Sequence, residues 1–311
     1  IKRVLFSMAT GLASLYYSIK RSNRLWQKLA LPLLFLPYAL LDRLVLAKIR
    51  QATGGKLKGS VSGGGALPLH VDLFFNSIGI PVLEGYGMTE TSPVLAVRTM
   101  DRLIPGTVGP IYPDTELRLV DPQTKKVVWP GPEGIGKKGE IHVRGPQVMQ
   151  GYYKNPEATA AVIRDGWLNT GDLGLMTDDG CLRIVGRTKE TIVLLGGENV
   201  EPVPIENRLL QSPLIAQCMV VGQDQKYLGA LIVPEAEQFR EYGQDLASIS
   251  HHPAVVQAIK SAIKECINDS TGFKSFERIV DFRLLPETFA VGAELTAKLS
   301  IKRHFIAEKY A

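Results

Sequence analysis

The middle of the chain switches from helix-type to strand-type patterning, and this switch limits the possible folds more than any other feature. Between about Gly106 and Val185 lie short runs of strand-forming residues, such as ELRLVD, GEIHVRG and LRIVG. Glycine, proline and aspartate separate these runs about every ten residues, as turns require. The pattern predicts a small twisted β-barrel or sheet at the centre of the chain.

The part before this centre predicts helices followed by a strand and a glycine-rich turn. Residues 1–50 have helix-like patterning, which a pair of glycines at 54–55 interrupts. The stretch KLKGSVSGGGALP, residues 56–68, then predicts a short strand, a tight turn and a helix over about 69–78. Three consecutive glycines allow a ligand to approach the backbone and its N–H groups. Taken alone, these glycines are more typical of a plain, tight strand-to-helix turn.

The part after the centre predicts a second, smaller unit. Helix-like and strand-like runs alternate from about residue 189, and residues 252–269 repeat apolar side chains at helical spacing. A chain of 311 residues exceeds the usual size of one domain. We therefore expect an α/β (mixed α+β) fold in two domains, a large one over 1–187 and a small one over 188–311.

Composition indicates a folded protein of a reducing compartment. The chain is 45% hydrophobic and 22% charged, which argues against wholesale disorder. Its three cysteines, Cys181, Cys218 and Cys266, are far apart, odd in number and without CxxC spacing. Neither a disulfide framework nor a zinc site is therefore expected, and the interpretation favours the cytoplasm.

The net charge of +5 is unevenly distributed. Residues 1–60 hold 11 Lys or Arg and one acidic residue, Asp42. Beside them runs LALPLLFLPYALL, residues 29–41, which is too short and too broken by Pro32 and Pro37 to span a bilayer. One interpretation is a buried helix pair with solvated basic flanks. The other is a basic, apolar protein surface that binds peripherally to the anionic inner face of a membrane. Nucleic acid is not an expected partner, because no recognition module accompanies the basic residues.

The stretch PVLEGYGMTETSPV, residues 81–94, concentrates polar groups directly after a predicted strand. Tyr86, on a turn flanked by glycines, could lie flat against a planar ring. Thr89 offers a hydroxyl to a phosphate oxygen, and Glu90 offers a hard carboxylate to Mg²⁺. A loop that caps the following helix is the alternative interpretation.

Two further residues suit the sugar of a nucleotide. Asp172, in DGWLNTGDLG, could accept two hydrogen bonds from a vicinal diol such as ribose; a simple turn residue is the alternative. Arg187, in VGRTKETIVLLGGENVEPVPIE, could hold ribose or phosphate oxygens; incidental charge at a hinge is the alternative. The chain contains no GKS or GKT, which excludes a Walker-type phosphate loop.

Taken together, these stretches resemble a known superfamily. YGMTE, GEIHVRGPQVMQGYYKNPEAT, TGD and GRTKE…GENVEP occur in the order and spacing of the adenylate-forming enzymes, which include acyl-CoA synthetases, luciferases and peptide-synthetase adenylation domains. GGENVEPVPIE and the ending LTAKLSIKRHFIAEKY resemble the long-chain fatty acyl-CoA or acyl-carrier-protein synthetase branch. The resemblance implies an ATP-dependent ligase that forms an acyl-adenylate and pyrophosphate, then transfers the acyl group to coenzyme A or acyl carrier protein.

The resemblance also implies roles for individual residues. Tyr86 would stack on adenine, Thr89 would contact the α-phosphate and Glu90 would bind Mg²⁺. Asp172 and Arg187 would hold the ribose. The remaining residues matched to the family's nucleotide and acyl pocket are Gly64, Gly65, Ala66 and Gly87. Lys189 falls at the hinge about which the small domain would swing as a lid, since the two half-reactions need different arrangements.

The first departure from the family is a missing loop. The family wraps the β- and γ-phosphates in a Ser/Thr/Gly-rich loop, roughly STSGTTGxPKG, and nothing in residues 1–60 resembles it. The chain, which starts without Met on a helix-like run, therefore resembles the C-terminal part of a synthetase, with a partial large domain and its small β-barrel part. We expect it to be inactive or impaired by itself, since much of the phosphate cradle is lacking. A non-catalytic or weakly nucleotide-binding fragment is the alternative function.

The second departure concerns the lysine that the lid carries into the site. In ELTAKLSIKRH, residues 294–304, the position of that lysine in the family pattern is occupied by Ser300. Lys298 and Lys302 each lie two residues away. In an extended segment this offset keeps the same face but shifts the amine by about 6–7 Å. All three residues therefore remain candidates for the catalytic-lysine role.

Overall fold

The computed structural model describes residues 2–21 and 28–310. Helices dominate its beginning: α1 (Lys2–Arg21), α3 (Leu31–Leu41), the π-helical turn η1 (Asp42–Leu46) and α4 (Ala47–Ala52). Ala9 and Ala13 are fully buried one helical turn apart and pack with Leu46, so small side chains let the helices approach closely. Within the described part of the chain, no helix is long and apolar enough to cross a bilayer.

A parallel strand pair follows and fixes two turns at one edge of a sheet. Strand β1 (Ser60–Ser62) pairs in parallel with β2 (Val82–Gly87), and helix α5 (Leu69–Ser77) makes the crossover between them. The short turn η2 (Thr89–Thr91) leads into β3 (Val94–Val97), which pairs antiparallel with β2. Because parallel strands end at the same edge, the glycine-rich turn after β1 and the Tyr86–Gly87 end of β2 lie at one edge of the sheet.

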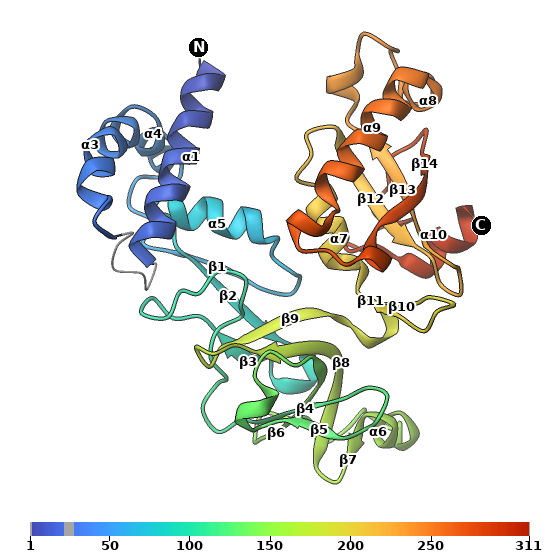
Figure 1. The fold of residues 1–311 in the computed structure, drawn as a ribbon. Helices are drawn as coiled ribbons and strands as arrows, with labels where there is room; N and C mark the ends of the chain where they lie inside the picture. The colour runs from blue at the N-terminus through green and yellow to red at the C-terminus, as the bar shows by residue number, and fades with distance from the viewer. Residues whose placement is uncertain (1, 22–27, 311) are drawn as a thin grey trace.

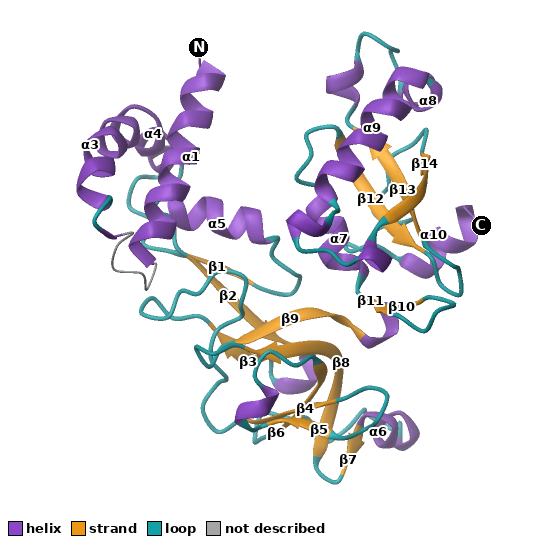
Figure 2. Cartoon of the chain, in the orientation of Figure 1, coloured by secondary structure: helices purple, strands orange, loops and turns teal. Residues whose placement is uncertain are grey.

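The β-rich centre forms one six-stranded sheet, drawn in orange in the lower part of Figure 2. Its strand order is β5-β4-β6-β8-β7, with β9 pairing β8, and every pairing is antiparallel. Its elements are β4 (Glu116–Val120), β5 (Val127–Trp129), η3 (Pro132–Gly134), β6 (Gly139–Arg144), α6 (Pro156–Val162), β7 (Ile163–Arg164), β8 (Trp167–Met176) and β9 (Leu182–Arg187). The predicted β-rich centre is thus confirmed. Leu95 and Ala96 of β3 belong to its apolar core, so the two sheets share one packed interior.

A short connection leads to the C-terminal unit. It consists of η4 (Thr188–Glu190) and the two-stranded β10 (Ile192–Val193) and β11 (Asn199–Val200). The unit itself has a sheet of order β12-β13-β14, in which β13 and β14 are parallel. Its elements are α7 (Pro202–Leu209), β12 (Ile215–Val221), β13 (Leu228–Pro234), η5 (Ala236–Phe239), α8 (Leu246–His251), α9 (Pro253–Cys266), η6 (Asp269–Thr271), η7 (Ser275–Glu277), β14 (Ile279–Leu284) and α10 (Arg303–Tyr310).

The C-terminal unit has an apolar core of its own. Val255, Ile259 and Ile263 of α9 are buried against strands β12 and β13, as their helical spacing predicts. In the view of Figure 1 this unit (orange to red) and the first helices (blue) lie above the β-rich centre (green). The mixed α/β architecture expected from the sequence is therefore confirmed.

Candidate functional site

The glycine-rich turn lies exposed at the end of β1. Residues 63–66, which include the predicted pocket residues Gly64, Gly65 and Ala66, are all solvent-exposed. Gly64 adopts φ +79°, a conformation that favours glycine. A Cβ built on Gly63 would lie 3.3 Å from the carbonyl oxygen of Gly85. The turn therefore lies close to β2 at Gly85, one residue before Tyr86.

Tyr86, Asp172 and Arg187 come together from three strands. The Tyr86 hydroxyl donates to Asp172 Oδ2 at 2.7 Å, and Arg187 Nε donates to Asp172 Oδ1 at 2.9 Å. Asp172 and Arg187 are register partners on β8 and β9. Burial, followed by the nearby Asp172 carboxylate, raises the pKa of Tyr86, so its hydroxyl keeps the proton that it donates. The structure thus joins three residues that the sequence analysis assigns to one nucleotide.

Glu90 follows on η2 and is bound to a distant tyrosine. Its Oε1 accepts a hydrogen bond of 2.8 Å from the Tyr152 hydroxyl, and its backbone oxygen accepts one of 2.8 Å from Met149 N. The hydrogen bond to Glu90 raises the pKa of Tyr152. Thr89, on the same turn, is exposed. The sequence analysis assigns no role to Tyr152, although GYYKNPEAT is among the motifs that it quotes.

The donor set at Glu90 fits a magnesium ion that accompanies a nucleotide. Mg²⁺ commonly binds through one or two carboxylates, with water and phosphate oxygens supplying its other ligands. Glu90 offers one partly exposed carboxylate. Across residues 2–21 and 28–310, no group of three or more His, Cys, Asp or Glu side chains converges as an all-protein metal cage would require.

Gly87 has a packing role in addition to its predicted place in the ligand site. A Cβ on Gly87 would lie 1.7 Å from the carbonyl oxygen of Pro93, which is an impossible contact. The Met88 N–H donates to that same Pro93 oxygen at 2.9 Å. Glycine at position 87 is therefore required for the chain to fold back from β2 into β3.

The loop that carries the candidate lysines is a tight turn, and the extended segment assumed from the sequence is wrong. Thr296 N donates to Ser300 O at 2.9 Å, and Ser300 N donates back to Thr296 Oγ1 at 3.1 Å. Leu299 turns the chain with φ +63°. The amide–hydroxyl pairing of Thr296 with Ser300 thus bends the segment and lifts residues 297–299 to an exposed tip.

This turn separates the three catalytic candidates. The Lys298 amine lies 3.6 Å from the position that a Cβ on Gly64 would occupy, so it faces the glycine-rich turn. Ser300 serves as the base of the turn through the bonds just described. Lys302 Nζ donates to Gly292 O at 2.9 Å, within its own unit.

Lys189 lies on η4, exposed, at the connection between the β-rich centre and the C-terminal unit. Its neighbour Glu190 pairs with Arg303 Nε at 3.4 Å. Arg303 also holds Glu206 through two bonds of 2.8 and 2.6 Å. The sequence analysis misses Arg303 and Glu206, because nothing in local pattern shows that the start of α10 meets α7.

The chain matches family models over most of its length. Residues 3–153 match the model described as AMP-binding enzyme, and residues 189–311 match the model described as AMP-binding enzyme C-terminal domain. The adenylation domain of a carboxylate reductase from Mycobacterium chelonae superposes with a TM-score of 0.71. At 23% identity, covering 99% of this chain and 44% of that one, it supports the fold alone.

Curated relatives are closer in sequence. A chloroplastic long-chain-fatty-acid–acyl-carrier-protein ligase of Arabidopsis thaliana is 38% identical over 94% of this chain and 40% of its own length. A long-chain-fatty-acid–CoA ligase of Mycobacterium bovis is 37% identical over 88% of this chain and 44% of its own length. The chain spans less than half the length of these relatives. With both family models matched in order and the fold shared, the chain belongs to the AMP-binding enzyme family.

Proposed function

We propose that the chain forms the nucleotide-binding and lid parts of an ATP-dependent long-chain fatty acid ligase. The observation that carries this proposal is the cluster of Tyr86, Asp172 and Arg187 at the sheet edge that also holds the glycine-rich turn. In such a ligase, ATP activates the fatty acid as an acyl-adenylate, and a thiol then takes the acyl group. Both coenzyme A and acyl carrier protein remain acceptors in this proposal, since ligases of each kind match at similar identity.

The contacts of the cluster support specific roles. Asp172 carries two acceptor oxygens and can accept hydrogen bonds from the ribose hydroxyls, while the ion pair with Arg187 orients the carboxylate. Tyr86 would offer its ring to adenine. Gly64, Gly65 and Ala66 would let adenine and the acyl chain approach the backbone. Glu90 would hold Mg²⁺, which when bound neutralises phosphate charge, with Thr89 beside the α-phosphate.

Lys298 is the lid residue that we propose to act in adenylation. A cation near the turn would stabilise the negative charge that develops as the carboxylate attacks the α-phosphate. Of the three candidates, only Lys298 has its side chain beside Gly64. In a full-length version, Lys298→Ala should lower the adenylation rate about 100-fold, whereas Lys302→Ala and Ser300→Ala should lower it far less. An equal loss in Lys302→Ala would refute the assignment.

The domain boundary between residues 187 and 188, with Lys189 as the hinge, is part of the same proposal. It is supported by the end of β9 at Arg187 and by the separate core of the C-terminal unit. A lid that swings about η4 would bring Lys298 to the nucleotide for one step and remove it for the other.

A calorimetric titration with a hexadecanoyl-sulfamoyl-adenosine, a stable mimic of the acyl-adenylate, tests the proposed function. The chain should bind one equivalent, and an acetyl analogue should bind more weakly because it buries less apolar surface. Adenosine alone serves as the control for the nucleotide part. No binding of either acylated analogue would refute the proposed ligase site.

The chain by itself should catalyse almost no fatty-acid-dependent ATP–pyrophosphate exchange. In the described part of the chain, helices α1, α3 and α4 precede the first strand, where the family's triphosphate loop would be expected. Without that loop the β- and γ-phosphates have few donors. Robust exchange by these 311 residues would contradict this expectation.

A peripheral contact with the inner face of a membrane is a second candidate function. Leu29, Leu33, Leu36 and Leu40 are more than half exposed, and the basic residues Lys20, Lys28 and Arg43 are exposed near them in sequence; residues 22–27 of the basic segment lie outside the described residues. Exposed apolar and basic side chains together favour anionic lipid surfaces. Co-sedimentation with anionic but not with zwitterionic vesicles would support the contact. No sedimentation with either kind of vesicle would refute the membrane contact.

A further inference from the structure

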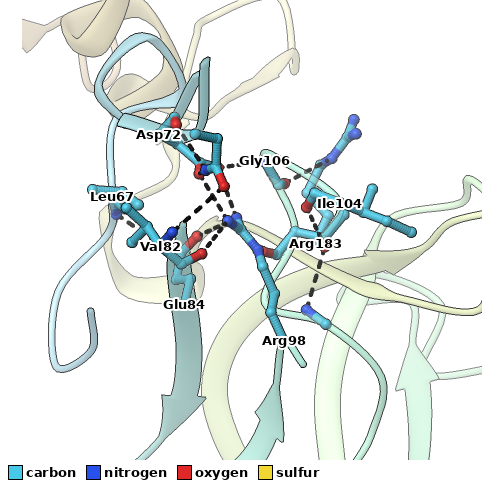
Figure 3. Close-up of polar contacts among 11 residues, drawn as sticks. Leu67, Asp72, Val82, Glu84, Arg98, Ile104, Gly106 and Arg183 are labelled. Carbon is cyan, nitrogen blue, oxygen red and sulfur yellow. Dashed lines mark hydrogen bonds and ion pairs between the residues drawn. The ribbon is translucent and has the colours of Figure 1, made fainter. Parts of the chain in front are cut away.

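A buried arginine lies beneath the glycine-rich turn and is not part of the site described above. Arg98 follows β3, is 1% exposed, and forms ion pairs with Asp72 of α5 and Glu84 of β2 (Figure 3). Its Nη1 and Nη2 atoms each donate to one oxygen of Asp72 at 2.8 Å. Nη2 also donates to Glu84 Oε2 at 2.7 Å. One guanidinium thus holds two carboxylates from two different elements.

Arg98 also donates hydrogen bonds to two backbone carbonyl oxygens. Nε donates to Thr107 O and Nη1 donates to Val82 O at 3.3 Å. Both carboxylate oxygens of Asp72 accept a further hydrogen bond. Oδ1 accepts one from Asn76 Nδ2 at 2.7 Å, and Oδ2 accepts one from the Gly106 N–H at 2.8 Å. A buried network with all members satisfied fixes one geometry rather than adding much stability, because desolvation offsets the attraction of the charges.

Glu84 connects this network to the proposed nucleotide site. Its second oxygen, Oε1, accepts a hydrogen bond of 3.2 Å from the Leu67 N–H, directly after the turn of residues 63–66. Glu84 and Tyr86 are two residues apart on β2, so their side chains leave the same face of the strand. Figure 3 shows Glu84 between Arg98 and Leu67. The carboxylate of Glu84 therefore links Arg98 to the backbone at the end of the glycine-rich turn.

The charge of Glu84 depends on Arg98. Burial raises the pKa of Glu84, and the Arg98 guanidinium opposes this rise. Without the guanidinium, the buried carboxylate would take up a proton more readily and would accept from Leu67 more weakly. The link from Arg98 to the turn is thus electrostatic as well as steric.

We propose that Arg98 is a positioning residue, which acts through Glu84 to hold the Leu67 amide and thereby the turn of residues 63–66 at the correct distance from Tyr86. This inference rests on the proposed function, since the turn and Tyr86 are there assigned to one adenylate. Arg98 itself is 1% exposed and is not among the residues proposed to contact the nucleotide or the fatty acid. A purely structural ion pair would stabilise the fold but would leave the affinity for adenylate unchanged.

Two substitutions in the complete chain, Arg98→Lys and Glu84→Gln, break the link at different points. Lysine keeps the charge but lacks the fork that spans both carboxylates. Glutamine keeps the Arg98–Asp72 fork and removes the charged acceptor for Leu67. Arg50→Lys is the matched control, because Arg50 also forms a bidentate pair, with Asp42 at 2.8 and 2.7 Å, but in the helical part of the chain.

Amide hydrogen exchange at Leu67 is the first readout. It should become about tenfold faster in Arg98→Lys and Glu84→Gln, since a charge-assisted hydrogen bond is weakened or lost. In Arg50→Lys it should equal that of the unchanged chain. If Arg98→Lys does not fold, Glu84→Gln supplies the same comparison.

Affinity for the hexadecanoyl-sulfamoyl-adenosine is the second readout. It should fall about tenfold in both variants and stay unchanged in Arg50→Lys. Unchanged Leu67 exchange and unchanged affinity in Glu84→Gln would overturn the inference. If the unchanged chain binds no analogue, the proposed function fails, and the exchange comparison still decides whether Arg98 holds the turn.

Discussion

Asp172 accepts hydrogen bonds from two side chains of different character, and this places it at the centre of the proposed site. Tyr86 supplies a neutral hydroxyl and Arg187 a cation, while the Asp172 side chain is 12% exposed. A carboxylate held from two sides has little freedom to rotate. Its remaining acceptor capacity is therefore pre-oriented for a ligand.

Removing the Tyr86 hydroxyl should destabilise the chain. In Tyr86→Phe the nearly buried Asp172 loses one of its donors, which should lower the free energy of unfolding by about 1–2 kcal/mol. Urea denaturation measures this, with Tyr112→Phe as the control, since Tyr112 is half exposed. Equal effects of the two substitutions would mean that the bond to Asp172 contributes nothing.

The residues of the site differ in how far the sequence predicts them. The sequence motifs single out Asp172 and Arg187 individually, but their pairing on the consecutive strands β8 and β9 is seen only in the structure. The bond from Tyr152 to Glu90 spans 62 residues and depends on tertiary packing. Arg98 resembles any polar residue after a strand, and its two carboxylate partners are recognisable only once α5 and β2 are placed.

At the scale of elements, the turn that carries Lys298 is anchored by hydrogen bonds of Glu294, which lies just before it. Glu294 accepts from Lys309 Nζ of α10 at 2.8 Å and from the Ala290 N–H at 3.0 Å. Lys302 N closes the base by donating to Glu294 O at 2.8 Å. The position of Lys298 near Gly64 thus depends on how the loop is attached to α10. The sequence suggests an extended segment because the turn bonds of Thr296 and Ser300 have no marker in the pattern.

Acid should weaken this attachment in a defined pH window. The bonds from Lys309 and from the Ala290 amide lower the pKa of Glu294 from 4.5 to about 2. Because the folded pKa is depressed, the contribution of Glu294 to stability is complete above pH 4.5 and is lost as the pH falls towards 2. The stability difference between the unchanged chain and Glu294→Gln should therefore shrink over this window. A difference that is constant from pH 6 down to about pH 2.5 would contradict the expectation.

Arg303 joins α10 to α7 within the C-terminal unit and to η4 of the connection. Arg303→Met would leave the buried Glu206 carboxylate without its cation, which should cost about 3–5 kcal/mol of stability. Arg240→Met is the control: its ion pair with Glu237 is largely exposed and should contribute less than about 1 kcal/mol. Chemical denaturation followed by the loss of helix signal measures both. Similar losses in the two variants would refute the role of Arg303.

At the scale of the whole molecule, side chains of the C-terminal unit contact the rest of the chain at several points, of which two bear on the proposed lid. Lys138 Nζ, next to β6, pairs with Glu201 Oε1 at 2.6 Å, just before α7. At the other contact, Lys298 approaches Gly64. Lys298 is exposed and Lys138 is partly exposed, whereas the Glu201 side chain is 11% exposed; the proposed lid motion would have to break both contacts.

Loss of the Lys138–Glu201 pair should loosen the connection between the units. In Lys138→Met, trypsin should cleave after Arg187 and Lys189 about two- to fivefold faster, because local opening of η4 becomes easier. Lys137→Met is the matched control, since it removes an adjacent exposed lysine and one tryptic site. Equal cleavage rates in the two variants would show that the pair does not restrain the lid.

The central claim, that Asp172 holds the ribose of a bound adenylate, is tested most directly by pairing a ligand change with a residue change. AMP and 2′,3′-dideoxy-AMP are titrated by calorimetry into the unchanged chain and into Asp172→Ala. The unchanged chain should bind AMP about tenfold more tightly than the dideoxy analogue, and Asp172→Ala should bind both equally and weakly. The same preference for AMP in both proteins, or no AMP binding by the unchanged chain, would contradict the claim.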